Sequence, residues 1–288
     1  MNDYGRPVEF GWFMSPDADR PDVLLDAARV ADRAGLDLIG VQDHPYNSGF
    51  LDTWTLLSAV GAVTERVRLF PDVANLPLRP PVMLAKAAAS LDRITGGRVE
   101  LGLGAGAFPD GIRAFGGTVG EPREKFEAVA EAIDVMDLFW SGRPASYAGK
   151  HFSMTGAHPG PRPLHDIGIW LGAFKPRMLD LLGRKADGWL PSLAFVPPDQ
   201  LGGAHEQIDE AARSAGRDPA EITRIYNVWG DFSTGQWVDL LTQVTLDHGM
   251  NGYVFGVPPV ESALRRISDE IAPAVREAVA TERNRRST

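Results

Sequence analysis

Asp43 and His44 are the residues of this 288-residue chain whose types and spacing best suit acid–base chemistry. They directly follow an apolar segment, residues 36–41, that the sequence predicts to be a buried strand. An imidazole gives or takes a proton near neutral pH, and a neighbouring carboxylate can fix its tautomer. We therefore predict a catalytic role for His44, against the alternative of a histidine that only fills the core.

Two further stretches carry small residues that let the backbone approach a ligand. In the first, glycines alternate along Gly102-Leu103-Gly104-Ala105-Gly106, although not with the G-x-G-x-x-G spacing of dinucleotide-binding loops. The second, Gly172-Ala173-Phe174-Lys175, leads into a predicted helix whose first turn contains Arg177. A helix N-terminus with flanking cations binds phosphate readily, and Ser192 follows the next predicted strand.

An amide and several aromatic rings complete the set of candidates. Asn75 stands in a proline-rich loop, residues 70–81, and is suited to hydrogen-bond the edge of a heterocycle; the alternative is a stiff connector. An apolar substrate pocket is predicted where aromatic side chains follow strands, although each ring could equally belong to the core: Trp12, Phe108, Phe174 and Trp229.

These groups can act together only if the fold gathers the strand ends in one place. Short β-rich segments alternate with longer segments of helical periodicity, eight of each. That order predicts parallel strands with right-handed crossovers, and eight repeats predict one (β/α)8 barrel over residues 1–288, with a doubly wound open sheet as the alternative. The predicted strands are 8–14, 36–41, 67–73, 99–103, 167–173, 189–192, 222–229 and 253–257, and the helices are 22–34, 53–66, 81–94, 122–140, 176–185, 198–215, 234–248 and 260–280.

Two segments do not fit the repeat. Residues 141–166 are rich in glycine and proline and too long for a plain turn, so we expect either a surface excursion with a small hairpin or a lid. The basic tail, residues 281–288, is expected to be flexible.

Composition excludes several classes of function. The chain has 29 basic and 38 acidic side chains, which argues against nucleic-acid binding, and it has no apolar run long enough to span a membrane. The absence of cysteine excludes disulfides and thiolate chemistry, and the histidines lack metal-binding spacing. We expect a cytoplasmic protein without a metal.

Several stretches resemble the bacterial luciferase-like superfamily of flavin-dependent oxidoreductases. They are Val41-Gln42-Asp43-His44-Pro45, Asn75-Leu76-Pro77-Leu78-Arg79-Pro80-Pro81, Gly96-Gly97-Arg98-Val99-Glu100-Leu101-Gly102-Leu103-Gly104-Ala105-Gly106, Trp170-Leu171-Gly172-Ala173 and Ala186-Asp187-Gly188-Trp189. The resemblance implies a barrel that binds a flavin or the deazaflavin coenzyme F420 at the C-terminal ends of its strands.

The resemblance also implies roles for individual residues. His44 lies near the ring and moves a proton or positions the substrate, while Asp43 touches the cofactor. A non-prolyl cis peptide at Asp72-Val73 supports the ring, with Asn75 at the ring or its side chain. The cofactor tail and its phosphate are expected at Ala105, Gly106, Gly172, Ala173, Phe174, Lys175 and Ser192.

Two departures from the family pattern bear on cofactor and substrate. Sugar-phosphate dehydrogenases of the superfamily carry a glutamate where this chain has Ala107, which argues against a sugar phosphate. Luciferase has an arginine for the flavin phosphate where Ala105 stands, which, together with Asp43-His44, favours F420 over FMN.

The expected function is therefore F420-dependent hydride transfer to or from a small organic substrate. The alternatives are a two-component FMN monooxygenase supplied by a separate reductase, a flavin-binding barrel without turnover, and a cofactor-free isomerase or lyase. The resemblance further implies a homodimer formed through the helices at residues 53–66 and 81–94.

Overall fold

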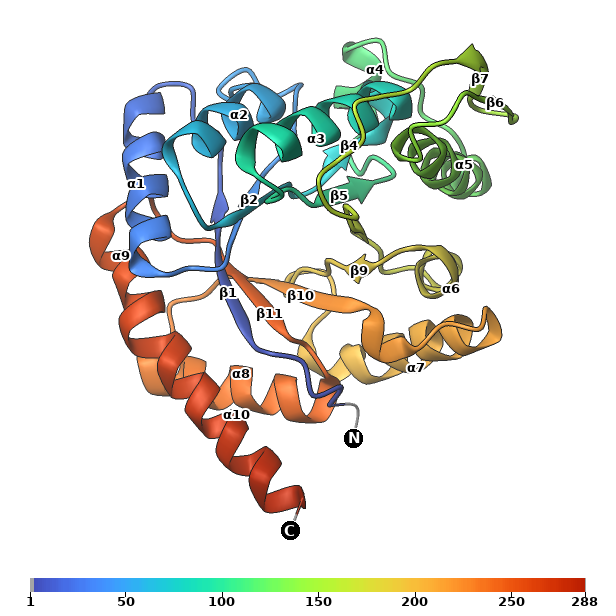
Figure 1. The fold of residues 1–288 in the computed structure, drawn as a ribbon. Coiled ribbons are helices and arrows are strands. Elements are labelled where there is room, and N and C mark those ends of the chain that lie inside the picture. The colour runs from blue at the N-terminus through green and yellow to red at the C-terminus, as the bar shows by residue number, and fades with distance from the viewer. Residues whose placement is uncertain (1–2, 288) are drawn as a thin grey trace.

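The computed structural model describes residues 3–287, and a ring of parallel strands forms its centre (Figure 1). Neighbouring strands follow the order β3-β2-β1-β11-β10-β9-β8-β5-β4. Strands β3 and β4 act as two pieces of one barrel strand, because β3 pairs with β2 while β4 pairs with β5. A bridge between Leu69 and Val99 also joins the two ends of the ring. The strands are β1 (Glu9–Met14), β2 (Leu38–Val41), β3 (Arg68–Pro71), β4 (Ala74–Asn75), β5 (Leu101–Gly104), β8 (Ile169–Leu171), β9 (Gly188–Trp189), β10 (Thr223–Val228) and β11 (Gly252–Phe255).

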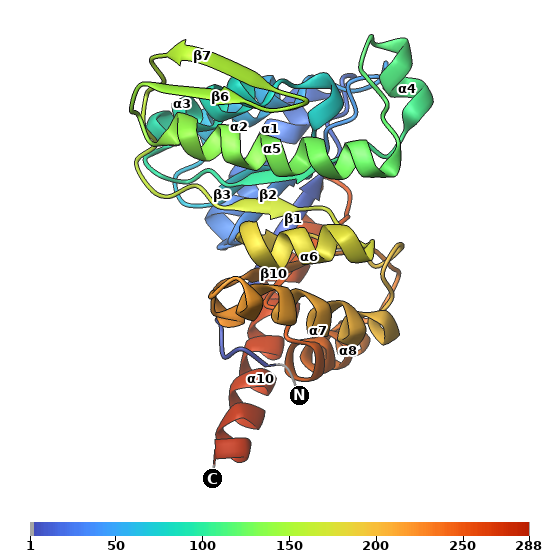
Figure 2. The same cartoon turned by 90° about the vertical axis from the view of Figure 1, so that its right-hand side faces the viewer.

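Helices surround this barrel on the outside (Figures 1 and 2). Local signals set their limits: Asp52 accepts a hydrogen bond from the amide of Thr55 at the start of α2, and Gly35 ends α1 in the left-handed conformation. The predicted (β/α)8 barrel is thus confirmed. The helices are α1 (Pro21–Ala34), α2 (Thr53–Val63), α3 (Pro81–Thr95), α4 (Pro109–Ala114), α5 (Pro122–Trp140), α6 (Pro176–Lys185), α7 (Pro198–Ser214), α8 (Thr234–His248), α9 (Glu261–Arg265) and α10 (Ala272–Ser287), with short turns η1 (Leu76–Leu78), η2 (Pro219–Glu221) and η3 (Arg266–Ile271).

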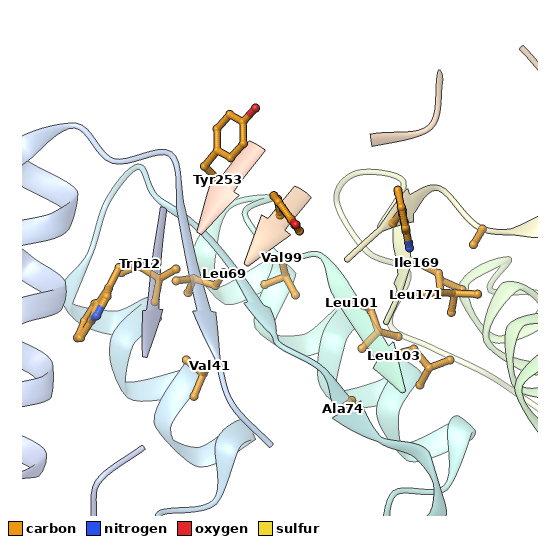
Figure 3. Close-up of a cluster of buried hydrophobic side chains, with 14 of the residues drawn as sticks. Trp12, Val41, Leu69, Ala74, Val99, Leu101, Leu103, Ile169, Leu171 and Tyr253 are labelled. Carbon is orange, nitrogen blue, oxygen red and sulfur yellow. The ribbon is translucent and has the colours of Figure 1, made fainter. Parts of the chain in front are cut away.

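The strands are buried on both faces, which explains their continuous apolar sequence. One set of side chains points outward and packs against the helices; Figure 3 labels Val41, Leu69, Leu101 and Leu103 among them. The inner face holds a separate cluster, formed by Leu38, Phe70, Trp170, Leu190, Ile225 and Val254. This inner cluster fills the inside of the barrel, so a ligand site is expected at the C-terminal ends of the strands, which we call the mouth.

The excursion at residues 141–166 contains a hairpin of β6 (Ala145–Ala148) and β7 (Ser153–Ala157). Its tip is fixed to the outside of α5, because the Glu131 carboxylate accepts hydrogen bonds from the amides of Lys150, His151 and Phe152. It returns along α3, where Lys86 donates to the carbonyl of Gly160. The surface hairpin is therefore the correct alternative, and the excursion is not a lid over the mouth.

The end of the chain continues as helix. Residues 281–287, which the sequence analysis expected to be flexible, extend α10, and Arg283 pairs with Asp3 at 2.7 Å.

Candidate active site at the C-terminal mouth of the barrel

The peptide bond Asp72-Val73 is cis, as the family resemblance implied. It interrupts the barrel strand between β3 and β4 and places Val73 in the mouth. Neighbouring glycines leave the space for this side chain: a Cβ atom at Gly104 would lie 2.7 Å, and one at Gly172 3.2 Å, from Cγ2 of Val73. The alternating glycines after β5 therefore accommodate the chain's own cis segment as well as any ligand.

Asp43, which follows β2, is buried and links the end of β2 to β4 and to the loop that contains Arg79. Its carboxylate accepts a hydrogen bond from the amide of Asn75 at 2.8 Å and two from the Arg79 guanidinium, each at 2.7 Å. Arg79 also pairs with Asp52 at 2.6 Å. Although burial disfavours its charge, these two carboxylates raise the pKa of Arg79. Asp43 therefore holds Asn75 in place, and its direct contact with a cofactor stays a prediction.

His44 lies beside the loop that follows β5. Its Nδ1 is 2.6 Å from the hydroxyl of Tyr46, and its ring meets that of Phe108 edge-on at 5.1 Å. Burial lowers the pKa of His44, with the nearby Asp43 acting in the opposite direction, so the imidazole is neutral at pH 7. The predicted catalytic histidine and the predicted pocket residue Phe108 are thus brought together.

Three buried acceptor atoms near the strand ends have no hydrogen-bond partner among the described residues: Asp72 Oδ2, Asn75 Oδ1 and Asn227 Oδ1. The other oxygen of Asp72 accepts from Asn227 Nδ2 at 2.9 Å. Burial raises the pKa of Asp72 to about 7. Buried polar atoms are nearly always paired, so Asn75 Oδ1 and Asn227 Oδ1 suit donors supplied by a ligand, while Asp72 Oδ2 accepts when the carboxyl is ionised and donates when it is protonated.

The segment Gly172-Ala173-Phe174-Lys175 follows β8 and packs on the segment that follows β9, which contains Ser192. The rings of Phe174 and Phe195 stack at 6.0 Å, and Trp189 Nε1 donates to the Ala173 carbonyl at 2.8 Å. Helix α6 starts behind this segment without a side-chain cap and without an acidic residue in its first turn. Within residues 3–287, neither Lys175 nor Arg177 forms an ion pair. The Gly172 amide already donates to the Leu103 carbonyl at 3.1 Å, and Lys175 Nζ lies 5.2 Å from the centroid of the Phe174 ring. The helix start and its two cations suit a phosphate.

Ala105 and Gly106 lie where the chain leaves β5. Gly106 has φ +83°, and a Cβ atom there would lie 2.7 Å from Cδ1 of Ile112 in α4. The Gly106 carbonyl accepts from Lys125 Nζ at 3.0 Å. This segment is therefore held between α4 and α5, and its contact with a cofactor tail stays a prediction.

The aromatic pocket differs in detail from the prediction. Trp12 is 1% exposed and its Nε1 donates to the Val257 carbonyl, so it packs outside the barrel. Its neighbour Phe13 points inward and meets Trp229, 37% exposed, edge-on at 5.0 Å. A cavity of about 280 Å³ beside them is lined by Trp12, Phe13 and Trp229 and also by the charged residues Asp17 and Arg20. A role for Trp12 in substrate binding stays a prediction. Phe13, which points inward, is better placed for that role.

Sequence reasoning missed Asn227, Arg79 and Tyr46. Asn227 had a usable signal, since it is a polar residue within an apolar strand. Tyr46 also had one, since it stands only two residues from His44. Arg79 had none, because Asp43 and Asp52 lie across loops whose path the sequence does not fix.

Neither a metal-binding cluster nor a membrane-spanning helix occurs among residues 3–287. No cluster of His, Asp and Glu there could hold a metal ion. No helix in that range is both long and apolar enough to cross a membrane.

A (β/α)8 barrel with a cis peptide after its third strand is the architecture that the resemblance to the luciferase-like superfamily implied. The comparison with family models agrees with it. Residues 8–229 match the family model described as luciferase-like monooxygenase. The chain therefore belongs to the luciferase-like monooxygenase family.

Individual relatives are more specific. The F420-dependent glucose-6-phosphate dehydrogenase of Kineococcus radiotolerans is 30% identical over 81% of this chain and 76% of its own length. The 5,10-methylenetetrahydromethanopterin reductase of Methanopyrus kandleri is 30% identical over 75% of this chain and 63% of its own. An F420-dependent secondary alcohol dehydrogenase, solved with an F420-acetone adduct, has the same fold, with a TM-score of 0.80 at 21% identity over 94% of this chain and 99% of that one.

Proposed function

We propose that this protein is an F420-dependent oxidoreductase that transfers a hydride between the deazaflavin and a small organic substrate. The observation that carries the proposal is the set of unpaired groups at the mouth: buried acceptors at Asp72, Asn75 and Asn227, and free cations at the start of α6. They fit a molecule with hydrogen-bond donors at one end and a phosphate at the other. The F420-dependent relatives support the same cofactor.

Each part of the cofactor has residues suited to hold it. Asn75 Oδ1 would accept from the heterocycle, Val73 would support its flat face, and Gly172 to Lys175, with Ser192, would hold the phosphate. Bound F420 supplies a carbon centre that carries a hydride, which the protein itself cannot provide. The chain's own task is to orient the substrate, exclude water and move a proton at His44.

The substrate class follows from the lining of the mouth. Phe13, Phe108 and Trp229 are aromatic and partly accessible, so we infer an apolar or aromatic carbonyl or alkene compound, or the corresponding alcohol. Ala107 replaces the glutamate of the sugar-phosphate dehydrogenases. We therefore infer that glucose 6-phosphate, the substrate named for several relatives, is not used here.

Fluorescence titration with F420 and with FMN tests the cofactor. We expect micromolar F420 binding that weakens about tenfold in Lys175→Ala, because a charge-assisted phosphate contact is worth roughly 1.5–3 kcal/mol and neighbouring amides compensate in part. Lys150→Ala at the hairpin tip is the matched control and leaves binding unchanged, since Lys150 pairs with Glu127 on the outside of α5. Binding of FMN alone, or equal effects of the two variants, would overturn the proposal.

The second candidate is a two-component FMN monooxygenase supplied by a separate reductase. The family's description and the fold shared with a long-chain alkane monooxygenase, at a TM-score of 0.80 and 12% identity, favour it. Oxygen consumption with reduced FMN and a panel of apolar substrates distinguishes the two functions. Loss of turnover with retained cofactor affinity in His44→Ala separates either enzyme from a passive flavin-binding barrel.

We further propose a homodimer formed through α2 and α3. Met83 and Ile94 of α3 are 61% and 73% exposed, as expected for side chains that a second copy covers. Light scattering on the purified protein tests the assembly. The cytoplasmic location stays a prediction.

A further inference from the structure

Tyr46 has no role in the function described above, yet it makes the closest contact to His44. Its hydroxyl oxygen lies 2.6 Å from Nδ1 of His44, and the two ring centroids are 5.5 Å apart. Tyr46 is itself held from behind by α4. A Cβ atom at Gly111 would lie 2.6 Å from Cγ of the phenol ring, so the glycine lets the helix backbone pack directly on that ring.

The positions of the protons follow from this geometry. Among residues 3–287, His44 Nδ1 is the only hydrogen-bond partner of the Tyr46 hydroxyl, and His44 Nε2 has none. Burial raises the pKa of Tyr46 and lowers that of His44, so both groups are neutral at pH 7. Asp43 is the charged residue that acts on both, and its carboxylate is already neutralised by Arg79. Either the phenol donates to Nδ1 or Nδ1–H donates to the phenol oxygen. Because a neutral phenol is a stronger acid than a neutral imidazole N–H, donation by the phenol is favoured, and it leaves the imidazole hydrogen on Nε2.

We propose that Tyr46 is a positioning residue that holds His44 as the Nε2–H tautomer and thereby makes it a proton donor at the mouth. The role of His44 as a proton donor in catalysis rests on the proposed function, whereas the assignment of its tautomer does not. The edge-on ring of Phe108 assists by limiting rotation of the imidazole.

The assignment fixes the direction of proton movement in carbonyl reduction. The hydride, with its electron pair, adds to the carbonyl carbon, and the Nε2 proton goes to the oxygen, so the carbonyl becomes an alcohol. The Tyr46 hydroxyl then passes its proton to Nδ1, and water at the protein surface restores the hydroxyl. His44 is then neutral with its proton on Nδ1. To regain the Nε2–H tautomer, Nε2 takes a proton from water, the Nδ1 proton returns to the Tyr46 oxygen, and the Tyr46 hydroxyl releases its own proton to water.

Nitrogen NMR of the full chain without cofactor tests the tautomer. The protein contains six histidines, so ¹⁵N-histidine labelling gives a small set of signals, and the His44→Gln spectrum identifies those of His44. We expect a protonated Nε2 and an unprotonated Nδ1 at pH 7. In Tyr46→Phe we expect a mixture of tautomers with averaged shifts, because Nδ1 has lost its donor. Tyr147→Phe removes the same hydroxyl from the distant hairpin strand β6 and leaves the His44 signals unchanged.

The result that overturns the inference is a protonated Nδ1 in the wild type, or His44 signals that do not respond to Tyr46→Phe. Kinetics add a second readout. With F420 and a carbonyl substrate, Tyr46→Phe lowers kcat roughly 10- to 100-fold at unchanged KM, a part of the usual general-acid contribution. If the protein does not bind F420 but shows the predicted tautomer, the proposed function is refuted and the Tyr46 assignment stands. If the protein turns over with F420 and Tyr46→Phe has an unchanged kcat, the proposed function stands and the role of Tyr46 is refuted.

Discussion

The two ends of the barrel differ in whether their polar side chains have hydrogen-bond or ion-pair partners within the protein. At the N-terminal end, Arg68 lies between Glu9 and Glu100, at 2.6 and 3.0 Å, and the second oxygen of Glu100 accepts from the amide of Gly168 at 2.7 Å. A cavity of about 390 Å³ lies there, but charged residues of both signs line it. At the C-terminal end, buried acceptors of Asp72 and Asn75 have no partner. The N-terminal end, although it has the larger of these two cavities, therefore has a structural role. The C-terminal end, where buried polar atoms have no partner, is the end that suits a ligand.

The largest combined effect on stability and on cofactor affinity is expected from Asp43→Ala. It leaves Arg79, whose side chain is 16% exposed, with Asp52 as its one acidic partner in the described structure. Breaking a buried pair costs about 3–5 kcal/mol, and the remaining partner reduces this to roughly 2–4 kcal/mol of unfolding free energy. Urea unfolding measures it. F420 affinity falls as well, because Asn75 loses the acceptor of its amide.

The matched control is Asp26→Ala, which breaks the exposed pair with Arg29 on α1. Exposed pairs are worth about 0–1 kcal/mol, so stability and cofactor affinity hardly change. If both variants lose equally little stability, the junction at Asp43 does not organise the mouth.

Asp72→Asn changes the pH dependence of stability. The pKa of Asp72 is raised by burial to about 7, so the folded protein keeps a proton that the unfolded chain loses near pH 4. The wild type therefore loses stability as pH rises from about 4 to 7, at up to about 1.4 kcal/mol per unit of pKa difference. Asp72→Asn lacks this loss while keeping an amide next to Asn227. Thermal unfolding between pH 4.5 and 8 compares the two proteins, and parallel curves would show that Asp72 is charged in the fold.

The smallest effect is expected at the opposite end. Arg68→Met removes the cation between Glu9 and Glu100, and because these side chains are 27% and 10% exposed, we expect a cost of about 1–2 kcal/mol. Cofactor affinity, measured by the same fluorescence titration, stays unchanged. A tenfold loss of F420 affinity in Arg68→Met would remove the distinction between a structural and a functional end.

The sequence predicted the barrel well because its evidence is periodic. Each strand is covered on both faces, so apolar runs stand out against amphipathic helices such as α5, whose predicted bounds match the structure. The strand ends were less certain: within the predicted strand 67–73 only β3 (Arg68–Pro71) is a strand, because the cis segment at Asp72 and Val73 ends it, and β4 (Ala74–Asn75) lies beyond the predicted range. Only the family resemblance gave that bond.

Side-chain direction was the harder part of the site. In a strand, neighbouring residues face opposite ways, so an uncertainty of one position exchanges Trp12 for Phe13 as the inward ring. The ion pair between Asp43 and Arg79 depends on the path of a proline-rich loop, which no local sequence pattern determines. The sequence thus proposed His44 and the α6 N-terminus as candidates, whereas most of the groups that contact them are visible only in the fold.

A crystal structure of the protein with F420 tests the central claim most directly. The account predicts the deazaflavin ring against Val73, with Asn75 Oδ1 accepting a hydrogen bond from it and the phosphate at Gly172 to Lys175. A cofactor bound elsewhere, or a mouth in which Asp72, Asn75 and Asn227 find partners within the protein instead, would contradict it.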